Sequence, residues 1–158
     1  MYFRNQKGAA AIEFAIVLPL LVILVFGVIE VGLLLYNKQV ITNASREGAR
    51  AGITLTDPDL WDDASREVEI QTIVSDYCTN DDGNSILINL NGPDALDPDG
   101  NPANNIIVIP PDADAGNFDL SVEVRYDYNF FFGAILGLDS GITIRSRTVM
   151  RMESNWEP

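Results

Sequence analysis

Apolar residues are concentrated near the beginning of the chain. Phe14–Ile29 contains sixteen residues without a charged side chain, and adding residues 9–13 extends the run to 21 residues. A helix of that length spans about 31 Å, which matches the ~30 Å thickness of the hydrocarbon core of a bilayer. A second apolar stretch, Val31–Tyr36, follows Glu30. The pattern predicts a transmembrane helix over residues 9–36.

Glu13 is an acidic residue inside this run, and an acid is costly in lipid. The thirteen Leu, Ile, Val and Phe residues of 14–29 supply roughly −4 to −8 kcal/mol, against about 2.5–3.5 kcal/mol for one central acid. The segment therefore inserts. Arg4 and Lys7 precede it, so the positive-inside rule keeps the N-terminus cytoplasmic and exports the rest. A cleaved secretory signal is the rival interpretation, but its apolar region is shorter, about 7–15 residues.

Pro19 lies in the middle of the predicted span. Proline removes one helix hydrogen bond and crowds the preceding turn, so we expect a helix kink here. Membrane helices tolerate such a kink where neighbouring groups satisfy the freed carbonyl. Two interpretations stay open: a helix that bends when it is repacked, and an ordinary membrane helix that contains a proline.

The helix is predicted to continue beyond the span, over residues 37–56. Ala44, Gly48 and Gly52 recur every four residues and therefore share one helix face. Small residues at this spacing permit close packing against another backbone. We expect this face to pack on the sheet of the same chain, with a neighbouring subunit as the alternative.

Residues 57–158 predict an exported α+β head domain. Apolar residues recur with helical spacing over 58–78, which predicts a second helix. Short β-branched or alternating segments predict strands, mostly antiparallel, over 85–90, 105–110, 118–128 and 141–152. The expected fold class is α+β, with a long N-terminal transmembrane helix, a second helix and a small sheet.

The last two predicted strands carry opposite charges. Arg145, Arg147 and Arg151 share one face of the final strand, and Glu123 and Asp127 lie on the polar face of the strand before it. Adjacent antiparallel strands would bring these groups together, so we expect cross-strand ion pairs. The alternative is a basic stripe that contacts a partner or lipid headgroups.

The connection between these two strands, residues 129–138, is unusually apolar. Three interpretations stay open. The segment completes a small core, dips into the membrane surface, or binds another subunit.

Charge limits the classes of partner. The chain has a net charge of −13, and residues 57–158 hold five basic and twenty acidic residues, a balance of −15. Such a head would be repelled by phosphate backbones, so we expect no nucleic-acid binding.

Composition also limits chemistry. The chain has no histidine and one cysteine, Cys78, which excludes Ser-His-Asp and Cys-His catalysis and multi-cysteine zinc sites. Cys78 is either a half-buried thiol or the site of a disulfide between chains. The loop Asp97–Asn101 spaces oxygen ligands as calcium loops do, but it fails the EF-hand pattern. We expect no cofactor, no metal site and no enzyme activity.

Residues 7–21, KGAAAIEFAIVLPLL, resemble the class III signal of type IV pilin-like proteins, which consists of a basic leader, a glycine at the cut, a glutamate as fifth mature residue and an apolar helix. More narrowly, the chain resembles the TadE-like pseudopilins, or minor pilins, of tight-adherence (Flp) pilus systems. The positions that match are Gly8, four residues, Glu13 and Phe14. The resemblance continues through 18–32 and 41–52.

This resemblance implies that a prepilin peptidase cuts between Gly8 and Ala9 and removes a leader, residues 1–8. It gives Glu13, followed by Phe14, a role in processing, assembly and subunit registry. The cut would place a positive amine on Ala9, one helical turn from Glu13, so the carboxylate could neutralise its own amine or that of a neighbouring subunit.

The function implied by the resemblance is assembly of a tight-adherence pilus. The implied partners are the prepilin peptidase, other pilin-like subunits, the pilus assembly platform and the membrane. The implied location is the bacterial inner membrane, crossed once, with a cytoplasmic N-terminus and a periplasmic or extracellular head. The alternative function is a membrane-anchored exported binding module with an uncleaved signal anchor.

Overall fold

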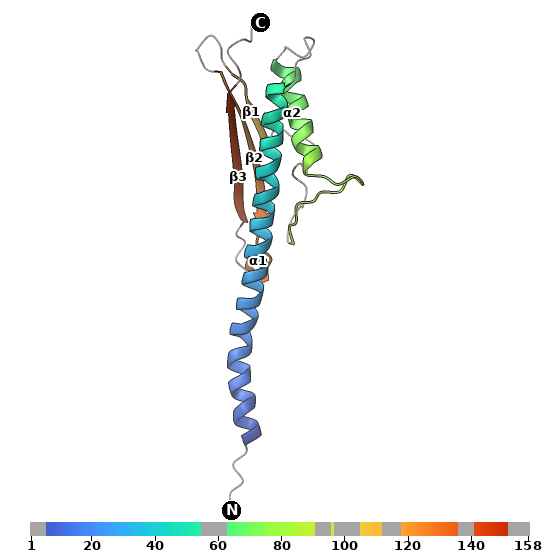
Figure 1. Cartoon of the computed structure of the whole chain (residues 1–158). Coiled ribbons are helices and arrows are strands. Elements are labelled where there is room, and N and C mark those ends of the chain that lie inside the picture. The colour runs from blue at the N-terminus through green and yellow to red at the C-terminus, as the bar shows by residue number, and fades with distance from the viewer. Residues whose placement is uncertain are drawn as a thin grey trace, which may run out of the picture.

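A computed structural model describes residues 6–54, 63–90, 96, 105–111, 118–135 and 141–151 of the chain. Its elements, in order, are α1 (Gln6–Thr54), α2 (Asp63–Tyr77), β1 (Ile106–Ile109), β2 (Asp119–Asn129), α3 (Phe131–Ile135) and β3 (Gly141–Arg151). Figure 1 shows α1 running along most of the molecule, with the other elements gathered around its upper part. The expected α+β fold, with a long N-terminal helix, a second helix and a small antiparallel sheet, is confirmed.

Several predicted positions lie outside the described residues. They are most of the predicted leader (residues 1–5), the end of the helix continuation (55–56), the expected beginning of the second helix (58–62), the candidate calcium loop (97–101), part of the apolar connection (136–138) and the last position of the final strand (152).

The sheet has the strand order β1-β2-β3, and both pairings are antiparallel. In β2 the alternation expected from the sequence is confirmed. Even-numbered side chains are buried, and most odd-numbered ones are more exposed. The buried set is Leu120, Val122, Val124, Tyr126 and Tyr128. One face of the sheet therefore faces the core.

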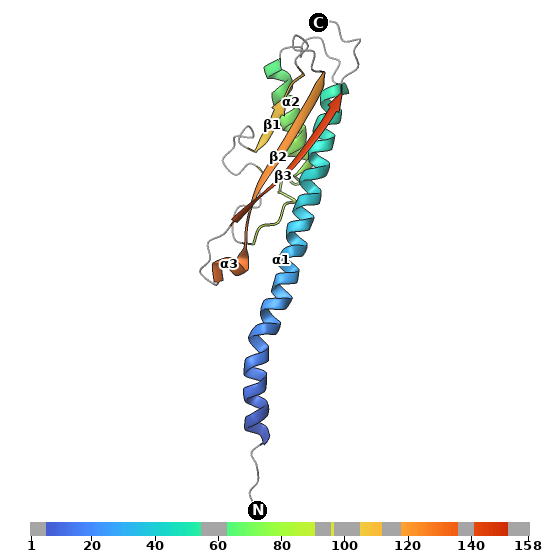
Figure 2. The same cartoon turned by 90° about the vertical axis from the view of Figure 1, so that its left-hand side faces the viewer.

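The core lies between this face and the two long helices. Ile41 from α1, Ile70 and Val74 from α2, and Val122 from β2 have no solvent exposure. Burying each such side chain contributes roughly 1.5–3 kcal/mol. The upper part of α1 is thus one wall of the head, and the lower part is free of it (Figure 2).

The strand predicted over residues 85–90 is wrong. The segment is extended, but it forms a single bridge, between Thr79 and Ser85. Its backbone is bound instead by a side chain of α1. The Asn37 amide donates to the Ile88 carbonyl at 2.5 Å and accepts from the Ile88 N–H at 2.9 Å. Asn37 is completely buried, so its amide takes the place that a neighbouring strand would have.

A polar seam of hydroxyl groups joins α1 to β3. The Ser45 hydroxyl lies 3.2 Å from that of Ser146 and 2.8 Å from that of Thr148. Ser146 also donates to the Thr42 hydroxyl at 3.2 Å. These groups satisfy one another, which allows a polar contact to be buried between a helix and a sheet.

The ion pairs expected between β2 and β3 do not form as predicted. The register places Arg147 opposite Glu123, yet the Glu123 carboxylate accepts from Arg125 of its own strand, at 2.7 Å. Residues two apart on a strand share a face, so the long Arg125 side chain reaches Glu123 first. Arg147 donates to the Ser121 hydroxyl at 2.7 Å, and Asp127 accepts from Thr143 at 2.6 Å.

Cys78 directly follows α2 and is 1% exposed. Burial raises the pKa of its thiol to about 12, because the thiolate would lose its hydration. The thiol is more deeply buried than the sequence indicated. A disulfide between chains would require this part of the head to open.

We predict that folded protein resists alkylation at Cys78. At pH 8 iodoacetamide should modify the native chain at least ~100-fold more slowly than the chain in denaturant, because both access and thiolate fraction are low. The raised pKa of Cys78 also makes the stability of the fold depend on pH. The neutral thiol stabilises the fold below the ordinary pKa near 9, and this contribution is lost as the pH rises toward 12. Mass spectrometry of timed samples measures the rate, and equal rates in both states would contradict the prediction.

Candidate processing site and membrane anchor

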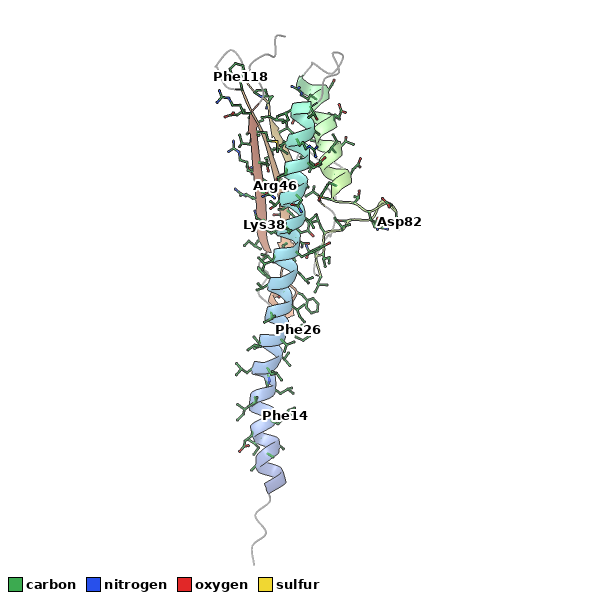
Figure 3. The ribbon with its side chains drawn as sticks, in the orientation of Figure 1. Phe14, Phe26, Lys38, Arg46, Asp82 and Phe118 are labelled. Atoms are coloured by element: carbon green, nitrogen blue, oxygen red, sulfur yellow. The ribbon has the colours of Figure 1, made fainter. Side chains whose placement is uncertain are left out.

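The candidate processing residues lie on the free lower part of α1. Gly8, Ala9, Glu13 and Phe14 are all exposed, and the Phe14 side chain is 62% exposed. Figure 3 shows Phe14 pointing away from the helix, far below the head. A Cβ atom added at Gly8 would meet no other atom within 4 Å. The fold of the head therefore places no demand on these residues.

The Gly8–Ala9 bond lies close to the start of α1, which begins at Gln6. The first N–H groups of a helix have no partner within it, so unwinding this turn breaks few hydrogen bonds. Glycine lowers the cost further, since it favours the helix less than alanine does by about 1 kcal/mol. A peptidase can therefore extend the backbone here without disturbing the head.

Glu13 lies one helical turn beyond Ala9, on the same side of α1. Among the described residues it has no hydrogen bond or ion pair, and its side chain is exposed. The Glu13 carboxylate is therefore available to a partner that the described part of the uncut chain does not supply. The amine created by a cut after Gly8 is one such group.

The surface of α1 around these residues is apolar. Within the described residues one helix, in Gly8–Thr54, is long and apolar enough to cross a membrane, and none of its most apolar window is buried. Leu20, Leu24 and Val28 are each more than half exposed. An apolar helix with no protein cover is suited to lipid or to neighbouring helices. α1 continues through Pro19, and the kink expected there stays a prediction.

The small residues of α1 lie against the head of the same chain. A Cβ atom at Gly48 would lie 2.4 Å from Val74 Cγ2, and one at Gly52 would lie 2.4 Å from Leu120 Cδ2. Ala44 is completely buried. Glycine at these two positions lets α1 approach α2 and β2 more closely than any other residue would.

Glu30 is a buried acid whose contacts the sequence reasoning passed over. It is 7% exposed, and its carboxylate accepts hydrogen bonds from the backbone N–H groups of Phe131 and, at 3.4 Å, Phe132. It thus caps the first turn of α3, although the two lie about a hundred residues apart in the sequence. An acid so close to an apolar span was the available signal, because such a group needs a partner.

Aromatic residues surround this cap. The rings of Phe26 and Phe132 lie 4.9 Å apart, and those of Tyr128 and Phe130 lie 5.6 Å apart, edge to face. The Tyr128 hydroxyl is buried and has no hydrogen-bond partner among the described residues. Burial and, to a lesser extent, the Glu30 carboxylate raise the pKa of Tyr128. The cluster fixes α3 beside α1 at the lower end of the head.

The comparison with protein families gives a match in the N-terminal part of the chain. Residues 8–50 match the family model of TadE-like proteins. The match confirms the resemblance seen in the sequence. It begins at Gly8 and ends at Arg50, so the TadE-like segment contains the candidate cut, Glu13, the apolar span, Glu30 and Gly48, and it stops before the rest of the head.

Neither the search of curated proteins nor that of solved structures gives a match to the chain. The described residues also contain no group of three or more His, Cys, Asp or Glu side chains that could hold a metal ion.

Proposed function

We propose that this protein is a TadE-like minor pilin or pseudopilin that acts in assembly of a tight-adherence pilus. The observation that carries the proposal is the family match over residues 8–50, which starts at Gly8 and covers the whole apolar part of α1. TadE-like proteins are pilus-associated, and the role is structural rather than enzymatic. Its partners are other pilin-like subunits, the assembly platform and the membrane.

The first step in this role is removal of the leader. A prepilin peptidase cuts between Gly8 and Ala9, at a bond that lies near the helix start and clear of the head. The mature chain stays in the bacterial inner membrane with its N-terminus at the cytoplasmic side and its head exported. Arg4 and Lys7 favour this orientation by the positive-inside rule.

The second step is packing of α1 against other subunits. The Glu13 carboxylate pairs with a mature N-terminal amine, so that neither charge lies unpaired in the apolar environment. When the amine belongs to the neighbouring helix, its ion pair with Glu13 sets the axial position of one subunit relative to the next. The exposed apolar surface around Leu20 and Leu24 supplies the packing area.

Intact-mass measurement with N-terminal sequencing tests this function. The chain is extracted from membranes with and without a co-expressed prepilin peptidase. We expect a chain that begins at Ala9 when the peptidase is present and at Met1 when it is absent. A chain that still begins at Met1 in the host that carries its cognate peptidase would overturn the proposal and favour an uncleaved, membrane-anchored binding module.

A further inference from the structure

We propose that α3 and its phenylalanines lie in the outer interface of the bilayer, and that Glu30 holds them there, so that the head rests on the membrane. The occupant of this surface is a lipid bilayer. The inference rests on the part of the proposed function that makes α1 a membrane anchor. It does not depend on processing or on pilus assembly.

The position of α3 along α1 is the first observation. Figure 2 shows α3 at the lower end of the head, next to the point where α1 leaves it. The contacts at Phe26 and Glu30 fix this level on α1. Below it, the side chains of α1 have no protein cover in the described part of the chain.

The length of the span places the bilayer surface at the same level. A hydrocarbon core of ~30 Å accommodates about 20 residues of helix. Counted from Ala9, the core ends near Val28, and counted from Phe14 it ends near Leu33. Either count brings α3 to the boundary between hydrocarbon and headgroups.

The chemistry of the segment fits that boundary. Phe130, Phe131 and Phe132 are consecutive and each is half-buried, so each still offers part of its ring to the surroundings. Ile142, opposite Tyr128 in the sheet register, adds a side chain that is 45% exposed. Phenylalanine is among the residues that interfacial segments bury at the boundary between headgroups and acyl chains, where a peripheral apolar surface is stabilised.

Glu30 is the positioning residue. Its two backbone hydrogen bonds hold α3 against α1, and they also satisfy a carboxylate that would be costly beside lipid. A carboxylate that accepts hydrogen bonds from two N–H groups recovers part of the hydration that it loses on leaving water. The same contact therefore accounts for the acid at the end of the span and for the fixed height of the head above the bilayer.

Nitroxide depth measurements test the proposal on the full chain in vesicles of phosphatidylethanolamine and phosphatidylglycerol. The label is attached to Phe131→Cys, to Val22→Cys as an internal reference in the span, and to Asp82→Cys as a reference on the exposed head loop (Figure 3). Phe131→Cys keeps the N–H that Glu30 accepts. Cys78 is buried, so the parent chain serves as the labelling blank. The readout is collision with oxygen relative to collision with a neutral nickel chelate.

We expect the oxygen-to-nickel ratio at position 131 to lie between those at positions 22 and 82. A ratio equal to that at position 82 would overturn the inference and leave the anchor intact. Protection of position 131 from both oxygen and nickel would also overturn it, since a protein surface such as a second copy would then cover α3. A water-exposed label at position 22 would overturn the anchor, and the inference with it.

The positioning role of Glu30 has its own test. In the Phe131→Cys chain, Glu30→Ala should shift the label toward the ratio of the water-exposed reference. Glu30→Gln, which keeps an acceptor oxygen, should restore much of the depth. Glu47→Ala is the matched control, because Glu47 is an exposed acid on the same helix. An unchanged depth in Glu30→Ala would overturn the assignment of Glu30.

Discussion

Replacement of Gly8 by valine is expected to abolish cleavage of the chain by a prepilin peptidase. A protease subsite that accepts a residue without a side chain discriminates against added carbons, and three added carbons slow the reaction by about 100-fold or more. The structure allows the effect on cleavage to be separated from an effect on folding. A side chain at Gly8 meets no atom within 4 Å, so loss of cleavage cannot be attributed to a damaged head.

Co-expression with the peptidase, followed by intact mass, measures the fraction of cleaved chain. Gly27→Val is the control, since Gly27 is another glycine of α1 with open space around it. It should be cleaved as the parent chain is. Normal cleavage of Gly8→Val would contradict the assignment of the cut, and a defect in both variants would point to α1 as a whole.

The second large effect is expected at Gly48. Gly48→Leu should lower the free energy of unfolding by about 3 kcal/mol and the Tm of the head by about 10 °C. The added Cβ atom alone would lie 2.4 Å from Val74 Cγ2, and Val74 is fully buried and stiff at χ1. α1 and α2 would have to separate, which would open the core.

Near-UV circular dichroism of detergent-solubilised protein follows this transition, because Tyr126 and Tyr128 are buried in the head. Gly32→Leu provides the comparison. It makes the same change on the same helix, where no atom lies within 4 Å, and leucine favours the helix over glycine by up to about 1 kcal/mol. Equal losses of Tm in the two variants would show that the close approach at Gly48 contributes nothing.

Local sequence patterns predicted most of the fold because each of them is self-contained. The apolar run, its length and the alternation of β2 depend on residues near one another in the chain. The prediction failed at residues 85–90, since β-branched character is shared by a strand and by an extended segment. What decided between them was Asn37, 51 residues away.

The candidate site likewise has a part that local sequence patterns predict and a part that they do not. The spacing of Gly8 and Glu13 is local and was read directly, whereas the cap of α3 by Glu30 joins residues 101 positions apart. The sequence showed that 129–138 was too apolar for an ordinary connection and left three interpretations open. It could not choose, because the choice depends on the height at which the head is attached to α1.

The hydroxyl seam between α1 and β3 has a consequence for the order of folding during synthesis. Ser45 is made early, but its partners Ser146 and Thr148 come about a hundred residues later, from the last strand of the head. Contacts of such long sequence separation form slowly, because a large loop must close first. The face of α1 that carries Ser45 therefore stays uncovered until β3 has been made. The head is complete only when its final strand packs on α1. A chain that stalls before residue 141 would present an open, aggregation-prone face.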